Sequence, residues 1–303
     1  MSTARVPRTI ILSDLHLGRP GGAGRARAFE ALVGDCDRVI VNGDVAELHH
    51  ARYQRDAERE LDIFRDLCTS RGIRLDLVAG NHDPFVSDVR AIELADGAVY
   101  ITHGDAFHPA IAPWSPYAST MREAFDRAFG ARDASAREDT ARFLAAREAA
   151  IAEWRTMGAG AHISTLPNML LRPHRMAAVL AYWAAYPRLA ADWATRFSPR
   201  AGTVVVGHSH RAFSRTVGAR RVVNTGAYGF PGTPHAVVVE DGAVRLHRIV
   251  PRGPLYALAS QPRDSWPIAE ATDARMREGS GRPSTPPMNR AAPTIAPRSS
   301  DVS

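Results

Sequence analysis

Five short apolar runs of this chain each end in side chains that can bind a metal ion. The clusters are Asp14-Leu15-His16, Gly43-Asp44, Gly80-Asn81-His82-Asp83, His103-Gly104-Asp105 and Gly207-His208-Ser209-His210. The runs before them, typical of buried strands, are Thr9–Ser13, Arg38–Asn42, Leu75–Ala79, Ala98–Thr102 and Thr203–Val206. One cluster alone also fits a capped turn. Because the carboxyl ends of strands in an open α/β sheet face one crevice, the ordered set of five predicts a single site.

Helical and strand patterns alternate around these clusters. Arg25–Val33 and Gln54–Arg71 have helical spacing and separate the first strands, which gives the β-α-β-α order of a layered α/β sheet. Strands are predicted again toward the C-terminus, with hairpin turns at Gly218-Ala219 and Asp241-Gly242. These later strands are Phe213–Val217, Arg221–Thr225, Ala236–Glu240 and Ala243–Ile249.

Between these regions, residues 114–197 carry helical spacing alone. Met121, Phe125 and Phe129 recur every four residues, and four of the five tryptophans fall in this stretch. We predict a helical insertion that lies beside the crevice, because it leaves the sheet after His103 and returns before His208. Its aromatic residues and arginines fit either plain helix packing or a lid with an apolar groove for a hydrophobic substrate group.

The rest of the chain sets the domain limits. After residue 252 the sequence is rich in Pro, Ser, Arg and Ala without a period, so residues 260–303 are predicted to be a disordered tail. Residues 1–259 are then one domain that contains the insertion. The composition of the 303 residues, 45% apolar and 23% charged, is ordinary for a globular protein.

The charge and the cysteine content limit the class of partner and the cellular location. The net charge of +6 comes from arginines scattered among acidic residues, which disfavours nucleic acid as the partner. The N-terminus lacks the apolar region of a signal peptide, and Met176–Tyr186 is too short an apolar run to cross a bilayer. Cys36 and Cys68 form no paired motif, so we expect a reducing, cytoplasmic location.

The ordered clusters resemble the motifs of the calcineurin-like metallophosphoesterases over about residues 9–250. The resemblance implies an α/β fold, a four-layer α/β/β/α sandwich with a helical insertion, and a centre of two divalent metal ions. Mixed imidazole, carboxylate and amide ligands favour Mn, with Fe or Zn as alternatives. The implied ligands of the first ion are Asp14, His16, Asp44 and His210. Those of the second are Asp44, Asn81, His103 and His208, with Asp44 bridging.

The resemblance also implies the catalytic roles. A metal-activated hydroxide attacks phosphorus, and His82 faces the leaving oxygen to stabilise or protonate it. Asp83 is predicted to orient His82, and Asp105 either to orient a ligand or to cap a loop. His49 fits either the cleft lining or a solvated loop, and we favour the loop.

Within that superfamily, the His-Gly-Asp cluster, the insertion and the late segment Asn224–Ala227 resemble the UDP-2,3-diacylglucosamine hydrolase branch. That branch cleaves a pyrophosphate at the cytoplasmic face of the inner membrane; it has arginine where this chain has His82. We therefore predict a hydrolase of a small-molecule or lipid-linked phosphodiester or pyrophosphate, with peripheral membrane contact through the insertion. A nuclease or cyclic-nucleotide phosphodiesterase, and a non-enzymatic scaffold, are the alternatives.

Overall fold

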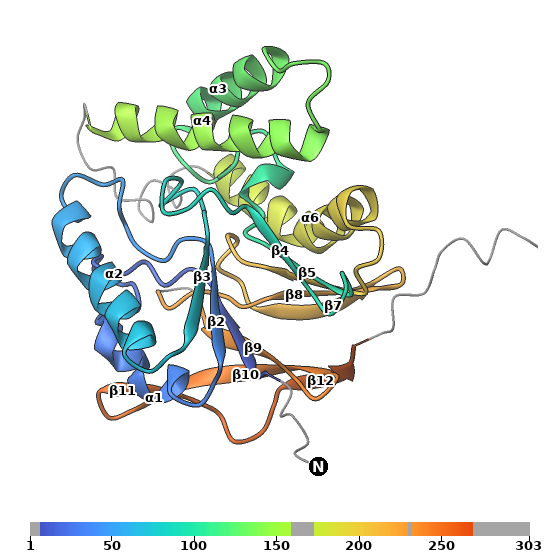
Figure 1. The fold of residues 1–303 in the computed structure, drawn as a ribbon. Helices are drawn as coiled ribbons and strands as arrows, with labels where there is room; N and C mark the ends of the chain where they lie inside the picture. The colour runs from blue at the N-terminus through green and yellow to red at the C-terminus, as the bar shows by residue number, and fades with distance from the viewer. Residues whose placement is uncertain (1–6, 159–172, 230–231, 269–303) are drawn as a thin grey trace, which may run out of the picture. The chain divides into compact units, whose positions relative to one another are not determined.

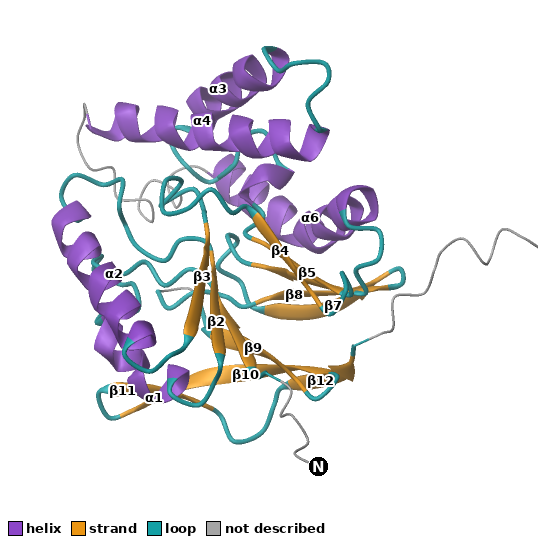
Figure 2. Ribbon diagram, viewed as in Figure 1, coloured by secondary structure: helices purple, strands orange, loops and turns teal. Residues whose placement is uncertain are grey.

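The computed structural model describes residues 7–158, 173–229 and 232–268, which form two mixed β-sheets with helices (Figure 1). The first sheet has the strand order β11-β10-β9-β1-β2-β3, with β12 paired to β10, and the second has the order β4-β5-β6-β8-β7. In Figure 2, helices flank both sheets. None of the helices in these described ranges combines the length and apolarity that a membrane span requires.

Nine of the strands in the described ranges follow the predicted runs closely, whereas β4, β11 and β12 have no predicted run. The strands of the first sheet are β1 Thr9–Leu12, β2 Arg38–Asn42, β3 Arg74–Val78, β9 His235–Glu240, β10 Ala243–Arg252, β11 Leu255–Leu258 and β12 Asp264–Pro267. Those of the second are β4 Ala91–Leu94, β5 Val99–Thr102, β6 Thr203–Val206, β7 Phe213–Val217 and β8 Arg220–Asn224. The pairs β1–β2, β2–β3, β5–β6 and β6–β8 are parallel, so the strand ends that precede the five clusters share a direction within each sheet.

Three separate apolar cores define four layers. One lies between the first sheet and the helices α1 Glu30–Val33 and α2 Gln54–Thr69, with Phe29 and Phe64 at its centre. The second joins the two sheets through residues such as Ile11 and Val205. The third lies between the second sheet and the remaining helices, and contains Tyr186. Helix, sheet, sheet and helix layers follow in this order, which confirms the predicted α/β/β/α sandwich.

The insertion divides into two parts with different roles. Its helices are α3 Ala118–Gly130, α4 Glu138–Gly158 and α6 Pro173–Phe197. Helix α6 buries Tyr186, Ala190 and Ala194 over the second sheet and is therefore the fourth layer of the sandwich itself. Of the three helices, only α3 and α4 are additional to this fourth layer, and they pack on each other. The stretch predicted as one cap is thus a structural layer plus a helix pair; residues 159–172 lie outside the described residues.

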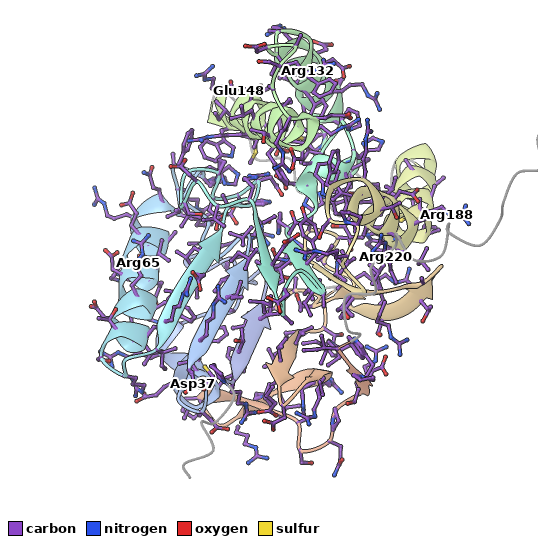
Figure 3. The ribbon with its side chains drawn as sticks, turned by 45° about the vertical axis from the view of Figure 1, so that its right-hand side comes forward. Asp37, Arg65, Arg132, Glu148, Arg188 and Arg220 are labelled. Carbon is purple, nitrogen blue, oxygen red and sulfur yellow. The ribbon has the colours of Figure 1, made fainter. Side chains whose placement is uncertain are left out.

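Alanine, not the large apolar residues, forms the buried face of α4. Leu144 of α4 is 55% exposed, and Leu180 of α6 is 53% exposed. The apolar residues of α4 that are buried instead are Ala141, Ala145, Ala146, Ala149 and Ala150. Small side chains let helices approach closely, so the contact face of such a helix is not its most hydrophobic stripe. Three arginines labelled in Figure 3 are exposed on outer elements: Arg65 on α2, Arg132 after α3 and Arg188 on α6.

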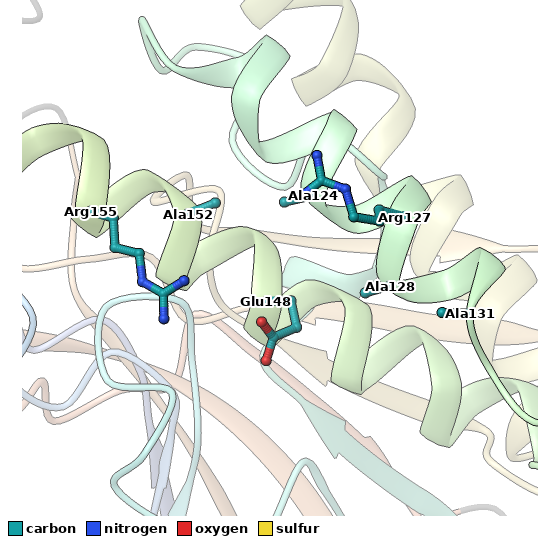
Figure 4. Close-up of a pocket in the computed structure, with 7 residues that line it drawn as sticks. All are labelled: Ala124, Arg127, Ala128, Ala131, Glu148, Ala152 and Arg155. Atoms are coloured by element: carbon teal, nitrogen blue, oxygen red, sulfur yellow. The ribbon is translucent and has the colours of Figure 1, made fainter.

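A cavity of about 320 Å³ lies between α3 and α4 (Figure 4). Four alanines line it together with Arg127 from α3 and Glu148 and Arg155 from α4. None of the five clusters contributes a residue to this lining.

The C-terminal boundary differs from the prediction. Strand β12 lies inside the segment predicted to be disordered, and it pairs with β10 from Ala243↔Pro267 to Leu246↔Asp264. Trp266 packs against the core between the sheets, and its Nε1 donates to Thr203 Oγ1 at 2.9 Å. One tryptophan on an edge strand next to Pro267 has no period from which to predict it. Residues 269–303 lie outside the described residues.

Ending the chain before β12 should therefore destabilise the domain. A chain that stops at Ser260 loses Trp266 and the β10 pairing, whereas one that stops at Ile268 keeps both. We expect the shorter chain to lose about 2 kcal/mol, and its Tm to fall by about 4–8 °C, relative to the longer one. Thermal unfolding of the two truncated chains measures the difference. Equal Tm values would show that β12 adds nothing to stability.

Candidate metal centre

The turns that carry the first two clusters are joined by main-chain hydrogen bonds beyond the ends of β1 and β2. Asp14 N donates to Gly43 O at 3.1 Å, His16 N to Asp44 O at 2.9 Å, and Leu17 N to Val45 O at 3.0 Å. Leu17 and Ala46 then form a further parallel bridge. The two turns therefore continue the parallel pairing of their strands, which fixes their side chains relative to one another.

Left-handed backbone is concentrated at this site. Nine non-glycine residues of the described ranges have positive φ, and five of them are predicted ligands. These five are Asp14 (φ 53°), His16 (47°), Asp44 (53°), His208 (65°) and His210 (58°). Such conformations are disfavoured for residues with a side chain, and they persist where surrounding contacts hold them for a function. The surrounding structure therefore holds these candidate ligands in a backbone conformation that ordinary loops seldom adopt.

Gly43 is the position where glycine is required most clearly. Its φ is +81°, and a Cβ atom there would lie 2.2 Å from His103 Nδ1. Gly80, in contrast, has no positive φ. A Cβ at Gly80 would instead lie 2.2 Å from Asp44 Oδ1, so this glycine provides space.

Four side chains from both sheets form the first group. Asp14, His16, Asp44 and His210 offer ligand atoms that all lie within 4.8 Å of one another. His16 Nε2 and His210 Nε2 are only 3.1 Å apart, and His210 Nε2 is 3.4 Å from Asp14 Oδ1. His16 Nδ1 lies 3.2 Å from Glu47 Oε2, which holds a donor on Nδ1 and leaves the lone pair of Nε2 toward the group.

The second group consists of His103, Asn81 and His208 beside Asp44. His103 Nδ1 is 2.8 Å from the Asn42 carbonyl oxygen, so Nδ1 carries the proton and Nε2 faces Asp44 Oδ2 at 3.3 Å. His208 Nε2 lies 3.0 Å from the Ile111 carbonyl oxygen. Its Nδ1 lies 2.9 Å from Asn81 Oδ1.

The ring of His208 is neutral in this environment. Burial and the charge of His103 lower the pKa of His208 to about 4. A neutral ring that donates from Nε2 has only a lone pair on Nδ1, and the Asn81 Oδ1 beside it also accepts. The His208 Nδ1 and Asn81 Oδ1 atoms, 2.9 Å apart, would then repel each other, and a cation bound to both would remove this repulsion.

Asp44 lies between the two groups. Its Oδ2 is 3.9 Å from His16 Nε2 and 3.3 Å from His103 Nε2, and its Oδ1 accepts the His82 main-chain N–H at 2.9 Å. Burial opposes ionisation of Asp44, but His103 and His82 outweigh it and hold its pKa well below the usual range. Burial likewise disfavours a charged His103, yet Asp44 and Asp14 raise the pKa of His103 to about 10. The carboxylates thus create a site that stabilises positive charge.

Glu47 is the important side chain that the sequence analysis missed. This glutamate is 3% exposed, and its Oε1 accepts from His82 Nδ1 at 2.8 Å while Oε2 contacts His16 Nδ1 at 3.2 Å. Burial disfavours an imidazolium, but Glu47 and Asp44 outweigh it and raise the pKa of His82 to about 9. Glu47 therefore links a candidate ligand to the candidate proton donor. The one signal in the sequence is its place three residues after Asp44.

Asp83 and Asp105 have other partners than those predicted. The Asp83 carboxylate accepts main-chain N–H groups of Gly80 at 2.8 Å, Asp44 at 3.1 Å and Val45 at 2.5 Å. It therefore holds two turns together, and the side chain that contacts the His82 ring is Glu47. Asp105 pairs with Arg90, whose Nη2 donates to both carboxylate oxygens at 2.8 and 2.6 Å.

His49 is part of the site and not a solvated loop residue. Its side chain is 2% exposed, and its Nδ1 lies 2.8 Å from the His82 carbonyl oxygen. The ring of Trp154, from α4, stacks on it with centroids 4.6 Å apart and an interplanar angle of 15°. Burial and the charge of His82 lower the pKa of His49 to about 3, so the stacked ring is neutral. This contact places α4 of the insertion beside His82.

The helix layer also supports the second group. The Tyr186 hydroxyl, from α6, donates to Gly207 O at 3.0 Å and lies 3.3 Å from His103 O. Asn224 Nδ2 donates to the same Gly207 carbonyl at 2.6 Å and to Ser209 Oγ at 3.0 Å. Asn224 therefore supports the turn that carries His208 and His210.

The arrangement fits bound divalent cations. His16 Nε2 faces His210 Nε2 in the first group, His208 Nδ1 faces Asn81 Oδ1 in the second, and His103 Nε2 is buried without a hydrogen-bond partner in the described part of the chain. The second nitrogen of His16, of His103 and of His208 contacts a carboxylate or carbonyl oxygen, as is usual for metal-bound histidine. Nitrogen, carboxylate and amide ligands together suit Mn, Fe or Zn.

Comparisons with known proteins give structural likenesses only. No protein-family model matches the chain, and no curated protein matches its sequence. Among solved structures, a predicted phosphoesterase from Streptococcus pneumoniae is 15% identical, with 84% of this chain and 98% of that chain covered and a TM-score of 0.36. The phosphoesterase Yfce from E. coli is 11% identical, with 86% and 100% covered and a TM-score of 0.40. Vps29 of Entamoeba histolytica, complexed with Zn²⁺, is 11% identical, with 86% and 99% covered and a TM-score of 0.38.

Proposed function

We propose that the protein is a metal-dependent hydrolase that cleaves a phosphodiester or pyrophosphate bond. The observation that carries this proposal is the Asp44 carboxylate, which lies between the Nε2 atoms of His16 and His103 with distances of 3.9 and 3.3 Å. A carboxylate in this position suits a pair of divalent ions, of which we favour Mn. Bound there, the ions would lower the pKa of a water and polarise the phosphoryl oxygens.

In the proposed reaction His82 donates a proton to the leaving oxygen. Glu47 holds Nδ1 of the ring at 2.8 Å, which orients the ring and leaves Nε2 for the leaving group. The side chain of His82 is 22% exposed, whereas that of Glu47 is 3% exposed, so the imidazole can reach a substrate and its partner is shielded from water. Glu47 is therefore a positioning residue that acts through His82 and His16.

Metal content and hydrolysis test the proposal directly. We expect the purified protein to bind up to about two divalent ions per chain and to hydrolyse bis-p-nitrophenyl phosphate with Mn. Treatment with a chelator should abolish the hydrolysis, and added Mn should restore it. Full activity of the chelator-treated protein would contradict the mechanism.

A second cavity supports an apolar group in the substrate. It has a volume of about 670 Å³ and lies between residues 108–122 and α6, with Pro113, Tyr182 and Leu189 in its lining. Trp114 separates it from the centre, because its ring is 5.4 Å from that of Tyr182 and 5.3 Å from that of His208. A lipid-linked nucleotide such as UDP-2,3-diacylglucosamine would place its apolar part there, with the protein at the surface of the inner membrane.

The alternatives are less well supported. A nuclease or cyclic-nucleotide phosphodiesterase needs the same centre, but a nuclease also needs a basic surface beside it. The four arginines labelled in Figure 3 lie on four different parts of the fold: Arg65 on α2, Arg132 after α3, Arg188 on α6 and Arg220 on β8. A non-enzymatic scaffold would not require candidate metal ligands to be held in turns with positive φ. Comparing hydrolysis of nucleotide sugars, cyclic nucleotides and DNA would separate these functions.

A further inference from the structure

Arg19 is a half-exposed arginine in the turn that carries His16. Its Nη1 donates to Glu47 Oε2 at 3.2 Å, and its side chain is 37% exposed. The other N–H groups of this guanidinium form no hydrogen bond with the described part of the chain. One edge of the group is thus anchored, and the rest is available to another acceptor.

The anchor places Arg19 beside the reacting groups. The same Glu47 carboxylate that accepts from Arg19 also contacts His16 Nδ1 at 3.2 Å and His82 Nδ1 at 2.8 Å. The Glu47 carboxylate therefore links Arg19 to His16, a candidate ligand of the first group, and to His82, the proposed proton donor.

The turn that carries Arg19 is held rigidly. Gly18 has a φ of +83°, and a Cβ there would lie 2.3 Å from Ala57 N of α2. Arg19 N donates to His16 O at 3.3 Å, and Glu47 N donates to Leu17 O at 3.1 Å. Because both ends of the Arg19–Glu47 contact are fixed by the main chain, the guanidinium has a defined position relative to His82.

We propose that Arg19 binds a second phosphoryl group of the substrate, on the side of the leaving oxygen. The inference rests on the proposed function, because it takes His82 as the group that faces that oxygen. An atom bonded to the leaving oxygen lies on the side that His82 and Arg19 share. A planar guanidinium with free N–H groups recognises phosphoryl oxygens through paired hydrogen bonds. Arg19 therefore selects phosphoanhydrides over esters with one phosphoryl group.

Binding of two nucleotides that differ by one phosphoryl group tests this role. The probes are adenosine 5′-monophosphate and α,β-methylene adenosine 5′-diphosphate, whose bridge resists hydrolysis, titrated into the Mn-loaded protein by calorimetry. We expect Arg19→Ala to weaken the diphosphate by about 10–100-fold and the monophosphate by less than about 3-fold. Arg19→Lys keeps the charge and should lose less of the diphosphate affinity than Arg19→Ala.

Arg25 provides the matched control. It lies in the same loop, its Nη1 is 3.6 Å from the buried carboxylate of Glu60, and its side chain is 79% exposed. Arg25→Ala should leave the affinity for both nucleotides unchanged. Equal losses for both nucleotides in Arg19→Ala would show that Arg19 only holds Glu47, and unchanged affinities would show no role; either result overturns the inference.

The outcome separates this inference from the proposed function. If wild-type protein binds neither nucleotide and hydrolyses no ester, the proposed phosphoryl site itself is wrong. If it binds both nucleotides with affinities that Arg19→Ala leaves in the same ratio, the hydrolase proposal stands and the role of Arg19 falls. A Tm of Arg19→Ala within about 3 °C of wild type, measured alongside, excludes a folding defect.

Discussion

Asp44→Asn should lower kcat/KM by roughly 10³-fold or more and reduce the bound metal. The substitution keeps the shape of the side chain but removes the negative charge that lies 3.3 Å from His103 Nε2 and 3.9 Å from His16 Nε2. Both proposed ions lose their shared anionic ligand, and the electrostatic support of the reaction goes with them. Elemental analysis of the dialysed protein and hydrolysis of bis-p-nitrophenyl phosphate measure the two effects.

Asp76→Asn is the matched control for the loss of one carboxylate. Asp76 lies on β3 in the same sheet, where Arg38 Nε donates to it at 2.6 Å, and its side chain is 21% exposed. We expect this variant to keep its metal and its activity. Normal metal content and rate in Asp44→Asn would remove the bridging role and the mechanism built on it.

His82→Ala should lower kcat by roughly 10²–10⁴-fold with the metal still bound, which is the usual range for loss of a general acid. The loss should be smaller for substrates that release p-nitrophenolate than for those that release an alkoxide, because a good leaving group needs no proton. Glu47→Gln should give the same pattern with a smaller loss of about 10–100-fold, since Glu47 acts through the ring.

His50→Ala is the control for removing an imidazole from this region. His50 follows His49, and its ring contacts Tyr53 at a centroid distance of 4.7 Å. Its kinetics should match wild type for both kinds of substrate. If His82→Ala slows both leaving groups equally, His82 supplies only electrostatic stabilisation and donates no proton.

Much of the fold could be predicted because the strands are short, fully buried and followed by polar clusters. β6 and β7 coincide with their predicted runs, and β1 and β2 agree to within a residue. The second sheet was harder to predict at its edge. Strand β4, Ala91–Leu94, pairs with only one neighbour, β5, and its side chains are only partly buried, so its sequence lacks a continuous apolar run.

Side-chain partners were predicted less well, because adjacency in sequence is a poor guide to adjacency in space. Asp83 follows His82 directly, yet successive residues point in different directions, and its carboxylate faces the main chain of residues 44–46. Glu47 could be placed only by knowing that the Leu17–Ala46 bridge extends the pairing past the strands. Trp154 and His49 come from segments about a hundred residues apart, and no local pattern joins them.

The two sheets contribute to the centre separately, and this affects the order of folding. Asp14, His16, Asp44 and Asn81 follow strands of the first sheet, whereas His103, His208 and His210 follow strands of the second. Neither sheet carries the whole set of candidate ligands, so high-affinity binding of the proposed ions would have to follow the docking of the two sheets. Bound ions would then act as a cross-link between the halves of the sandwich. Losing them would weaken the contact between the sheets first and the individual sheets only afterwards.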